Sequence, residues 1–114
     1  MLVEDERFVR EAACEILRAA GHSVLQARDP AEARRAFRRR GGGIRLLITD
    51  VVMPGQDGRS LAREIEALRP GLRKIFMSGY PERMVAPTCS GASFLAKPFS
   101  LDLLMRKVAE ILEK

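Results

Sequence analysis

The sequence has little of what several classes of protein depend on. Its two cysteines, Cys14 and Cys89, lie far apart without the spacing of a metal site, and a single pair makes no disulfide framework. No apolar run approaches the length of a membrane span and no signal peptide is visible, so we expect a cytoplasmic protein without membrane contact. The one histidine, His22, is expected to be a turn residue rather than a catalyst.

What is present fits one folded domain. The chain has 114 residues, of which 46% are hydrophobic and 31% charged, and this balance is typical of soluble globular proteins. The sequence contains no internal repeat, low-complexity tract or linker. We therefore expect a single domain over residues 1–114 with no output domain after it.

Arginine dominates the charge of the chain. Sixteen arginines and four lysines outweigh 15 acidic residues and give a net charge of +5. Such an excess is typical either of a surface that binds nucleic acid or an acidic partner, or of solvated helix faces. The helix in the cluster from Arg34 to Arg45 must use Ala33, Ala36 and Phe37 for the core, and no base-reading element is present. We favour solvated faces and expect no direct DNA binding.

Short apolar runs alternate with helical patterns along the chain. The runs predict strands over residues 1–3, 23–27, 46–50, 74–77 and 93–96. The period of the apolar residues predicts helices over 7–20, 30–40, 59–68 and 101–112, and residues 81–91 are expected to hold one or two helical turns. Phe8 and Leu68 are placed on the inward faces of their helices. The repeated order of strand and helix favours a parallel sheet covered by helices on both faces.

Four of the predicted strands end in polar residues. Glu4 and Asp5 follow the first strand, Asp50 ends the third, and Ser78 and Lys97 follow the fourth and fifth. The carboxyl ends of parallel strands share one edge of a sheet, where ligands bind. Taken alone, Asp50 is equally explained as the start of a turn, and the acidic run 4–6 is either solvated or gathered around a cation.

Together these residues suit phosphoryl chemistry. Glu4, Asp5 and Asp50 offer the hard oxygen ligands that Mg²⁺ prefers. Beside a bound cation the Asp50 carboxylate can attack phosphorus as a nucleophile. Lys97 can supply a point charge, and the Ser78 hydroxyl can donate a hydrogen bond to a phosphoryl oxygen.

The chain resembles the receiver domains of two-component response regulators. The resemblance rests on the acidic pair Glu4-Asp5, the loop TDVVMPGQDG that holds Asp50, Ser78 at a strand end, and the pair Lys97-Pro98. It implies a flavodoxin-like (βα)5 fold, an α/β doubly wound sandwich whose five-stranded parallel sheet has the order 2-1-3-4-5. The stretches LITDVVMPGQDG, FMSGYPE and FLAKPFSLDLL are most similar to the C-terminal receiver domains of hybrid sensor histidine kinases.

The family pattern implies a role for each matching position. By resemblance Asp50 is the phosphoacceptor, Ser78 and Lys97 contact the phosphoryl group, and Mg²⁺ or Mn²⁺ is held by Glu4, Asp5, Asp50 and the Val52 carbonyl. The magnesium-dependent self-phosphorylation of such a domain is a signalling reaction rather than turnover of a substrate.

Three further positions match residues that tune the family's switch. Phe94 matches the aromatic residue that changes rotamer when Ser78 moves. Val52 and Tyr80 border the route by which water reaches the phosphoryl group, and neither is suited to orient a water. The interval from Ser78 to Lys97 is about one helical turn shorter than usual for the family.

The resemblance implies a histidine kinase or a histidine phosphotransfer domain as the phosphodonor, and a homodimer as a further state. Two other interpretations stay open: a phosphorylation-independent interaction module with the same fold, and a hydrolase with an aspartyl-phosphate intermediate. Retention of all five polar residues disfavours the module, because a domain that keeps the fold alone does not need them. Val52 disfavours the hydrolase, since such enzymes carry an acid two residues after the nucleophile.

Overall fold

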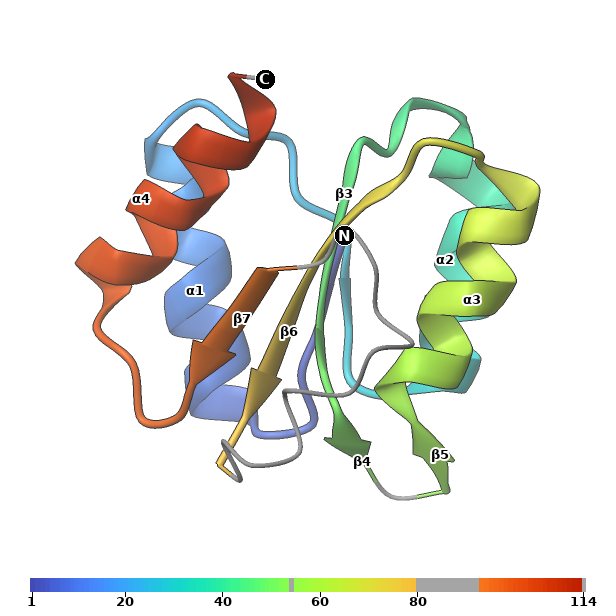
Figure 1. The fold of residues 1–114 in the computed structure, drawn as a ribbon, viewed down its shortest axis with the longest axis horizontal. Coiled ribbons are helices and arrows are strands. Elements are labelled where there is room, and N and C mark those ends of the chain that lie inside the picture. Colours follow the sequence, from blue (N-terminus) through green and yellow to red (C-terminus); the bar gives the residue numbers. More distant parts are fainter. Residues whose placement is uncertain (54, 80–92, 114) are drawn as a thin grey trace.

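The computed structural model describes residues 1–53, 55–79 and 93–113. A five-stranded parallel sheet in the order β2-β1-β3-β6-β7 runs through its centre (Figure 1). Its strands are β1 (Leu2–Val3), β2 (Gln26–Ala27), β3 (Leu46–Asp50), β6 (Arg73–Ser78) and β7 (Ser93–Ala96). Numbered within the sheet alone, this order is 2-1-3-4-5, so the predicted flavodoxin-like fold is confirmed.

Among the described residues, two helices cover each face of the sheet (Figure 1). Helices α1 (Arg7–Ala19) and α4 (Leu101–Leu112) lie on one face, and α2 (Pro30–Arg40) and α3 (Gly58–Leu68) lie on the other. A short 3-10 helix, η1 (Gly41–Gly43), follows α2. No helix in the described part of the chain is long and apolar enough to span a membrane.

The strands alternate their side chains between two separate cores, as a period of two requires. Leu47 and Phe76 pack with α2 and α3, whereas Ile48 and Ile75 pack with α1 and α4. Because β3 and β6 are buried along nearly their whole length, their apolar runs are continuous rather than alternating with polar residues.

Three of the helices begin with a side-chain cap. The backbone N–H groups of Glu32, Arg59 and Leu103 donate to the side chains of Asp29, Asp57 and Ser100, in that order. Helix α1 differs, because its N-cap residue Glu6 makes no such bond. The start of α1 must therefore be held by other contacts.

Two predicted inward positions are wrong. Phe8 is 82% exposed and Leu68 is 71% exposed. Both lie in a terminal turn of a helix, while α1 buries Ala13, Cys14 and Leu17 further along. A period of 3.6 residues identifies the apolar face of a helix, but it does not indicate where the sheet beneath it ends.

The strand predicted over residues 23–27 is also shorter than expected. Only Gln26–Ala27 forms β2, because its neighbour β1 offers only Leu2–Val3 as partners. The loop after Asp50 contains a small antiparallel hairpin of β4 (Val52–Met53) and β5 (Gln56–Asp57), which was not predicted. The helical turns predicted within residues 81–91 lie outside the described residues.

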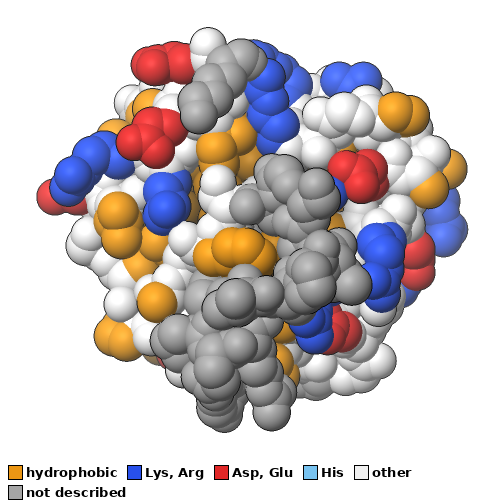
Figure 2. All heavy atoms as spheres, viewed as in Figure 1, with side chains coloured by type: hydrophobic (Ala, Val, Ile, Leu, Met, Phe, Trp, Pro, Cys, Tyr) orange, Lys and Arg blue, Asp and Glu red, His pale blue; other side chains and the backbone are white. Residues whose placement is uncertain are grey.

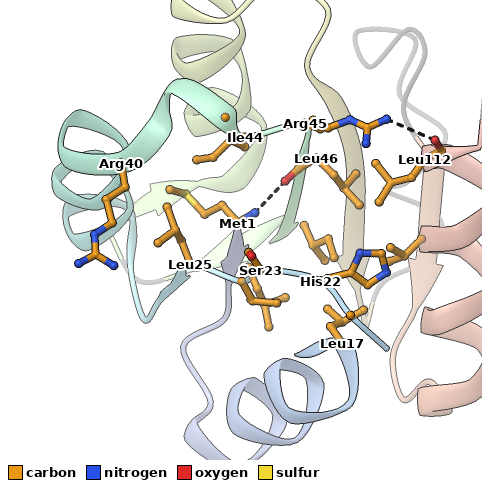
Figure 3. A pocket seen from close by; sticks show the side chains of 16 residues that line it. Met1, Leu17, His22, Ser23, Leu25, Arg40, Ile44, Arg45, Leu46 and Leu112 are labelled. Carbon is orange, nitrogen blue, oxygen red and sulfur yellow. Dashed lines mark hydrogen bonds between the residues drawn. The ribbon is translucent and has the colours of Figure 1, made fainter. Parts of the chain in front are cut away.

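A groove of about 580 Å³ opens at the amino edge of the sheet (Figure 3). Met1, Leu25 and Leu46 line its floor, and Arg45 at its rim donates to the Leu112 carbonyl over 3.4 Å. The strand-end residues singled out in the sequence lie at the opposite edge. On the face drawn in Figure 2, Lys and Arg side chains are scattered among Asp and Glu side chains and form no single basic patch.

Candidate functional site

The carboxyl edge of the sheet gathers three carboxylates. Glu4 and Asp5 follow β1, Asp50 ends β3, and one oxygen of each lies within 4.8 Å of the others. Glu4 is 1% exposed and Asp50 is 3% exposed, whereas Asp5 is exposed to solvent. The convergence predicted from the strand ends is confirmed for these residues.

Lys97 supplies the positive charge of this cluster. Its Nζ donates to both carboxylate oxygens of Glu4, over 2.8 and 3.0 Å, and lies 2.6 Å from Asp50 Oδ1. The Lys97 backbone N–H also donates to the Ser78 carbonyl over 2.8 Å, which fixes the end of β7 beside the end of β6. One ammonium group therefore faces two buried carboxylates.

Burial and the neighbouring charged groups shift the pKa values of Asp50 and Lys97. Burial, with the neighbouring Glu4 carboxyl adding to it and Lys97 opposing it, raises the pKa of Asp50 from 3.8 to about 8. Burial lowers the pKa of Lys97, but its interactions with the Asp50 and Glu4 carboxylates outweigh burial and the net direction is upward. The cluster thus favours an added positive charge.

The backbone around Asp50 is closely packed. Gly58, the first residue of α3, donates its N–H to the Val51 carbonyl over 2.7 Å. A Cβ at position 58 would lie 1.8 Å from the Asp50 carbonyl oxygen and 3.1 Å from Thr49 Oγ1. Only glycine fits there without displacing the strand end that carries Asp50.

Three of the other predicted site residues, Ser78, Phe94 and Val52, are described by the structure. Ser78 is buried at the end of β6, and the ring of Phe94 packs against Phe76 with centroids 5.9 Å apart. Val52 is 51% exposed on β4. Tyr80 lies outside the described residues.

The cluster suits a divalent cation with oxygen ligands. Both Asp50 carboxylate oxygens are buried and make no hydrogen bond of normal geometry with any described residue, although Lys97 forms an ion pair with one. Unsatisfied buried carboxylate oxygens are costly, and a cation would satisfy them. Glu4, Asp5 and Asp50 are close enough together to hold such an ion.

A family model for the response regulator receiver domain matches residues 1–109 of the chain. The chain belongs to this family. It is 40% identical to the sensor kinase CckA of Brucella abortus over 117 residues, which cover all of this chain and 12% of CckA. It is 30% identical to the response regulator receiver protein CpdR of the same organism, covering 98% of this chain and 94% of CpdR.

Solved receiver structures share its fold. The receiver domain of a hybrid histidine kinase CckA superposes with a TM-score of 0.84 at 38% identity, covering 97% of this chain and 95% of that one. NtrX from Brucella abortus superposes with a TM-score of 0.87 at 32% identity, covering 98% of this receiver but only 26% of NtrX. The receiver thus spans about an eighth of CckA and about a quarter of NtrX.

Sequence reasoning did not anticipate three contacts of the receiver site. These are the paired hydrogen bonds from Lys97 to Glu4, the approach of Gly58 to Asp50, and a hydrogen bond from Arg10 to the Glu4 carbonyl. A glycine at the first position of a helix was the one visible signal. The two hydrogen-bonded pairs depend on how loops fold around the sheet edge.

Gly58→Ala should lower the free energy of unfolding by about 1–3 kcal/mol, because the added methyl group must push the Asp50 carbonyl aside. Urea unfolding at constant pH measures this. Gly42→Ala is the matched control, since a Cβ there meets nothing within 4 Å. Equal stability of the two variants would contradict the close approach.

Asp50→Asn should stabilise the metal-free receiver by about 1–2 kcal/mol at pH 8 and by less at pH 5. A raised carboxyl pKa means that folding favours the protonated form, so wild-type stability falls as pH rises from 3.8 towards about 8. The amide does not titrate and escapes this loss. Urea unfolding in chelator at both pH values measures the difference.

Asp57→Asn is the matched control with the opposite sign. Burial acts to raise the pKa of Asp57, but its hydrogen bonds to Arg59 outweigh burial and lower it. Its contribution to stability is present above 3.8 and is lost as pH falls through the lowered pKa, so the amide should destabilise the receiver at both pH values. Destabilisation by Asp50→Asn at pH 8 would refute the account of the buried charge.

Proposed function

We propose that this receiver accepts a phosphoryl group on Asp50 in a magnesium-dependent step of a two-component phosphorelay, acting as one unit over residues 1–114. The observation that carries the proposal is the buried Asp50 carboxylate beside Lys97, Glu4 and Asp5. A histidine kinase or a histidine phosphotransfer domain would supply the phosphoryl group. The relative named a sensor kinase supports this class of partner.

In the proposed step an Asp50 oxygen attacks the phosphorus atom, the new O–P bond forms, and the bond from phosphorus to the donor breaks. Lys97 Nζ, already 2.6 Å from Asp50 Oδ1, would pair with a phosphoryl oxygen as the charge on Asp50 is used in the bond. The Ser78 hydroxyl would donate to another. Ser78 is held near Lys97 because the Lys97 N–H binds its carbonyl.

Glu4, Asp5, Asp50 and the Val52 carbonyl would hold Mg²⁺ or Mn²⁺. When bound, the cation neutralises phosphoryl charge and favours the ionised form of Asp50. The ionised form of Asp50 needs this stabilisation because, in the metal-free cluster, burial raises the pKa of Asp50 to about 8. Because Asp50 is buried, its reaction with a phosphodonor would depend on a bound divalent cation.

The phosphorylation test uses acetyl phosphate as the donor with and without Mg²⁺, read by intact mass. The wild type should gain the mass of one phosphoryl group only with Mg²⁺, and Asp50→Asn should gain none. Asp57→Asn, which changes a partly exposed carboxylate nearby, should label like the wild type. Full labelling of Asp50→Asn, or no labelling of the wild type, would overturn the proposal, and the second result would favour a phosphorylation-independent module.

The phosphorylated form should be long-lived, because hydrolysis needs a water held in line with the O–P bond. The Val52 side chain has no hydrogen-bonding group, and we propose that Tyr80, the other residue expected to border the route, does not orient a water either. Val52→Asn combined with Tyr80→Glu should speed the loss of phosphate. The decay of the labelled protein after donor removal measures this, and loss of the wild-type label within seconds would contradict it.

A further inference from the structure

We propose that Arg10 is a positioning residue that holds the acidic loop in its metal-binding form and so sets the affinity of this receiver for Mg²⁺. The inference rests on the proposed function and extends it to a residue that does not touch the phosphoryl group. Arg10 lies one turn inside α1, and its Nη1 donates to the Glu4 carbonyl over 2.9 Å.

The first support is the missing cap of α1. Helices α2, α3 and α4 are each started by a side chain that binds a first-turn N–H, whereas the N-cap of α1 makes no such bond. The bond from Arg10 reaches back from the helix to Glu4, the residue that follows β1. It thus takes over the task that a cap performs elsewhere, which is to fix how the chain passes from strand to helix.

The second support is how the rest of Glu4 is held. Its N–H donates to the Ala27 carbonyl over 3.0 Å, and its carboxylate accepts from Lys97 and, over 3.2 Å, from the Glu6 N–H. These bonds fix the Glu4 side chain and the Glu4 N–H group, which faces β2. The carbonyl that Arg10 binds belongs to the peptide linking Glu4 to Asp5, so Arg10 sets the plane of that peptide.

Asp5 is the member of the acidic triad that most needs this support. Glu4 and Asp50 are buried and held by Lys97, whereas Asp5 is exposed and makes no ion pair among the described residues. Its direction relative to the other two carboxylates is therefore determined by the backbone before it. Losing the Arg10 bond would leave that peptide free to rotate and Asp5 free to turn away.

Charge and positioning make opposite predictions for this residue, which allows a clean test. Removing a cation that binds the backbone of the acidic loop would by electrostatics alone strengthen the binding of Mg²⁺. Removing the hydrogen bond that orients a ligand weakens metal binding, typically by about 10-fold or more. The sign of the change therefore identifies which role Arg10 has.

The experiment measures the Mg²⁺ dissociation constant of the unphosphorylated receiver by isothermal titration calorimetry. Arg10→Met, which keeps the apolar stem but removes the charge and the donor, should raise the dissociation constant by about 10-fold. Arg10→Lys, which keeps the charge and a donor, should recover most of the affinity. With acetyl phosphate, Arg10→Met should need more Mg²⁺ but reach the wild-type rate at saturation.

Arg18→Met is the matched control. Arg18 lies on the same helix and donates to a backbone carbonyl, that of Val24, over the same 2.9 Å, but away from the acidic cluster. It should leave the dissociation constant unchanged while losing the same charge. Unchanged or tighter Mg²⁺ binding by Arg10→Met would overturn the inference and leave the proposed function intact, whereas a wild type that takes up no Mg²⁺ would overturn both.

Discussion

The contact of one ammonium group, that of Lys97, with two buried carboxylates is the interaction on which the rest of the receiver depends. Removing Glu4 and Asp50 from water is costly, and the pair is under-compensated because a single cation faces both. Burial, with the excess negative charge adding to it, explains the raised pKa of Asp50, and the excess charge makes the cluster suitable for a divalent cation. The structure tolerates this cost because the sheet and its helices hold all three groups in place.

The parallel sheet meets that requirement through the direction of its strands. The strands of successive βαβ units run in the same direction. The residues at the carboxyl ends of β1, β3, β6 and β7 therefore meet at one edge of the sheet although they are far apart in the sequence. Thr49 and Gly58 then pack tightly around the Asp50 backbone. None of the described residues that line the groove at the amino edge is a carboxylate.

The sequence was sufficient for the strands of the central sheet, for helices α1 to α4 and for the convergence of Glu4, Asp50 and Lys97, because strand direction alone brings strand ends together. The sequence was insufficient where the burial or length of one element depends on how far a neighbouring element extends. Phe8 fits the apolar period of its helix yet is exposed, since that period does not indicate where the core beneath the helix ends. The hydrogen bond from Arg10 depends on the path of a loop, which no local pattern encodes.

The contact between Glu4 and Lys97 joins residues 93 positions apart in the chain. Contacts of such separation form late in folding, because the loop between them must close first. During synthesis the acidic loop leaves the ribosome before its lysine, which follows 93 positions later. A nascent or truncated chain would therefore carry Asp50 without the charge that completes its surroundings, and competence to receive a signal would coincide with completion of the fold.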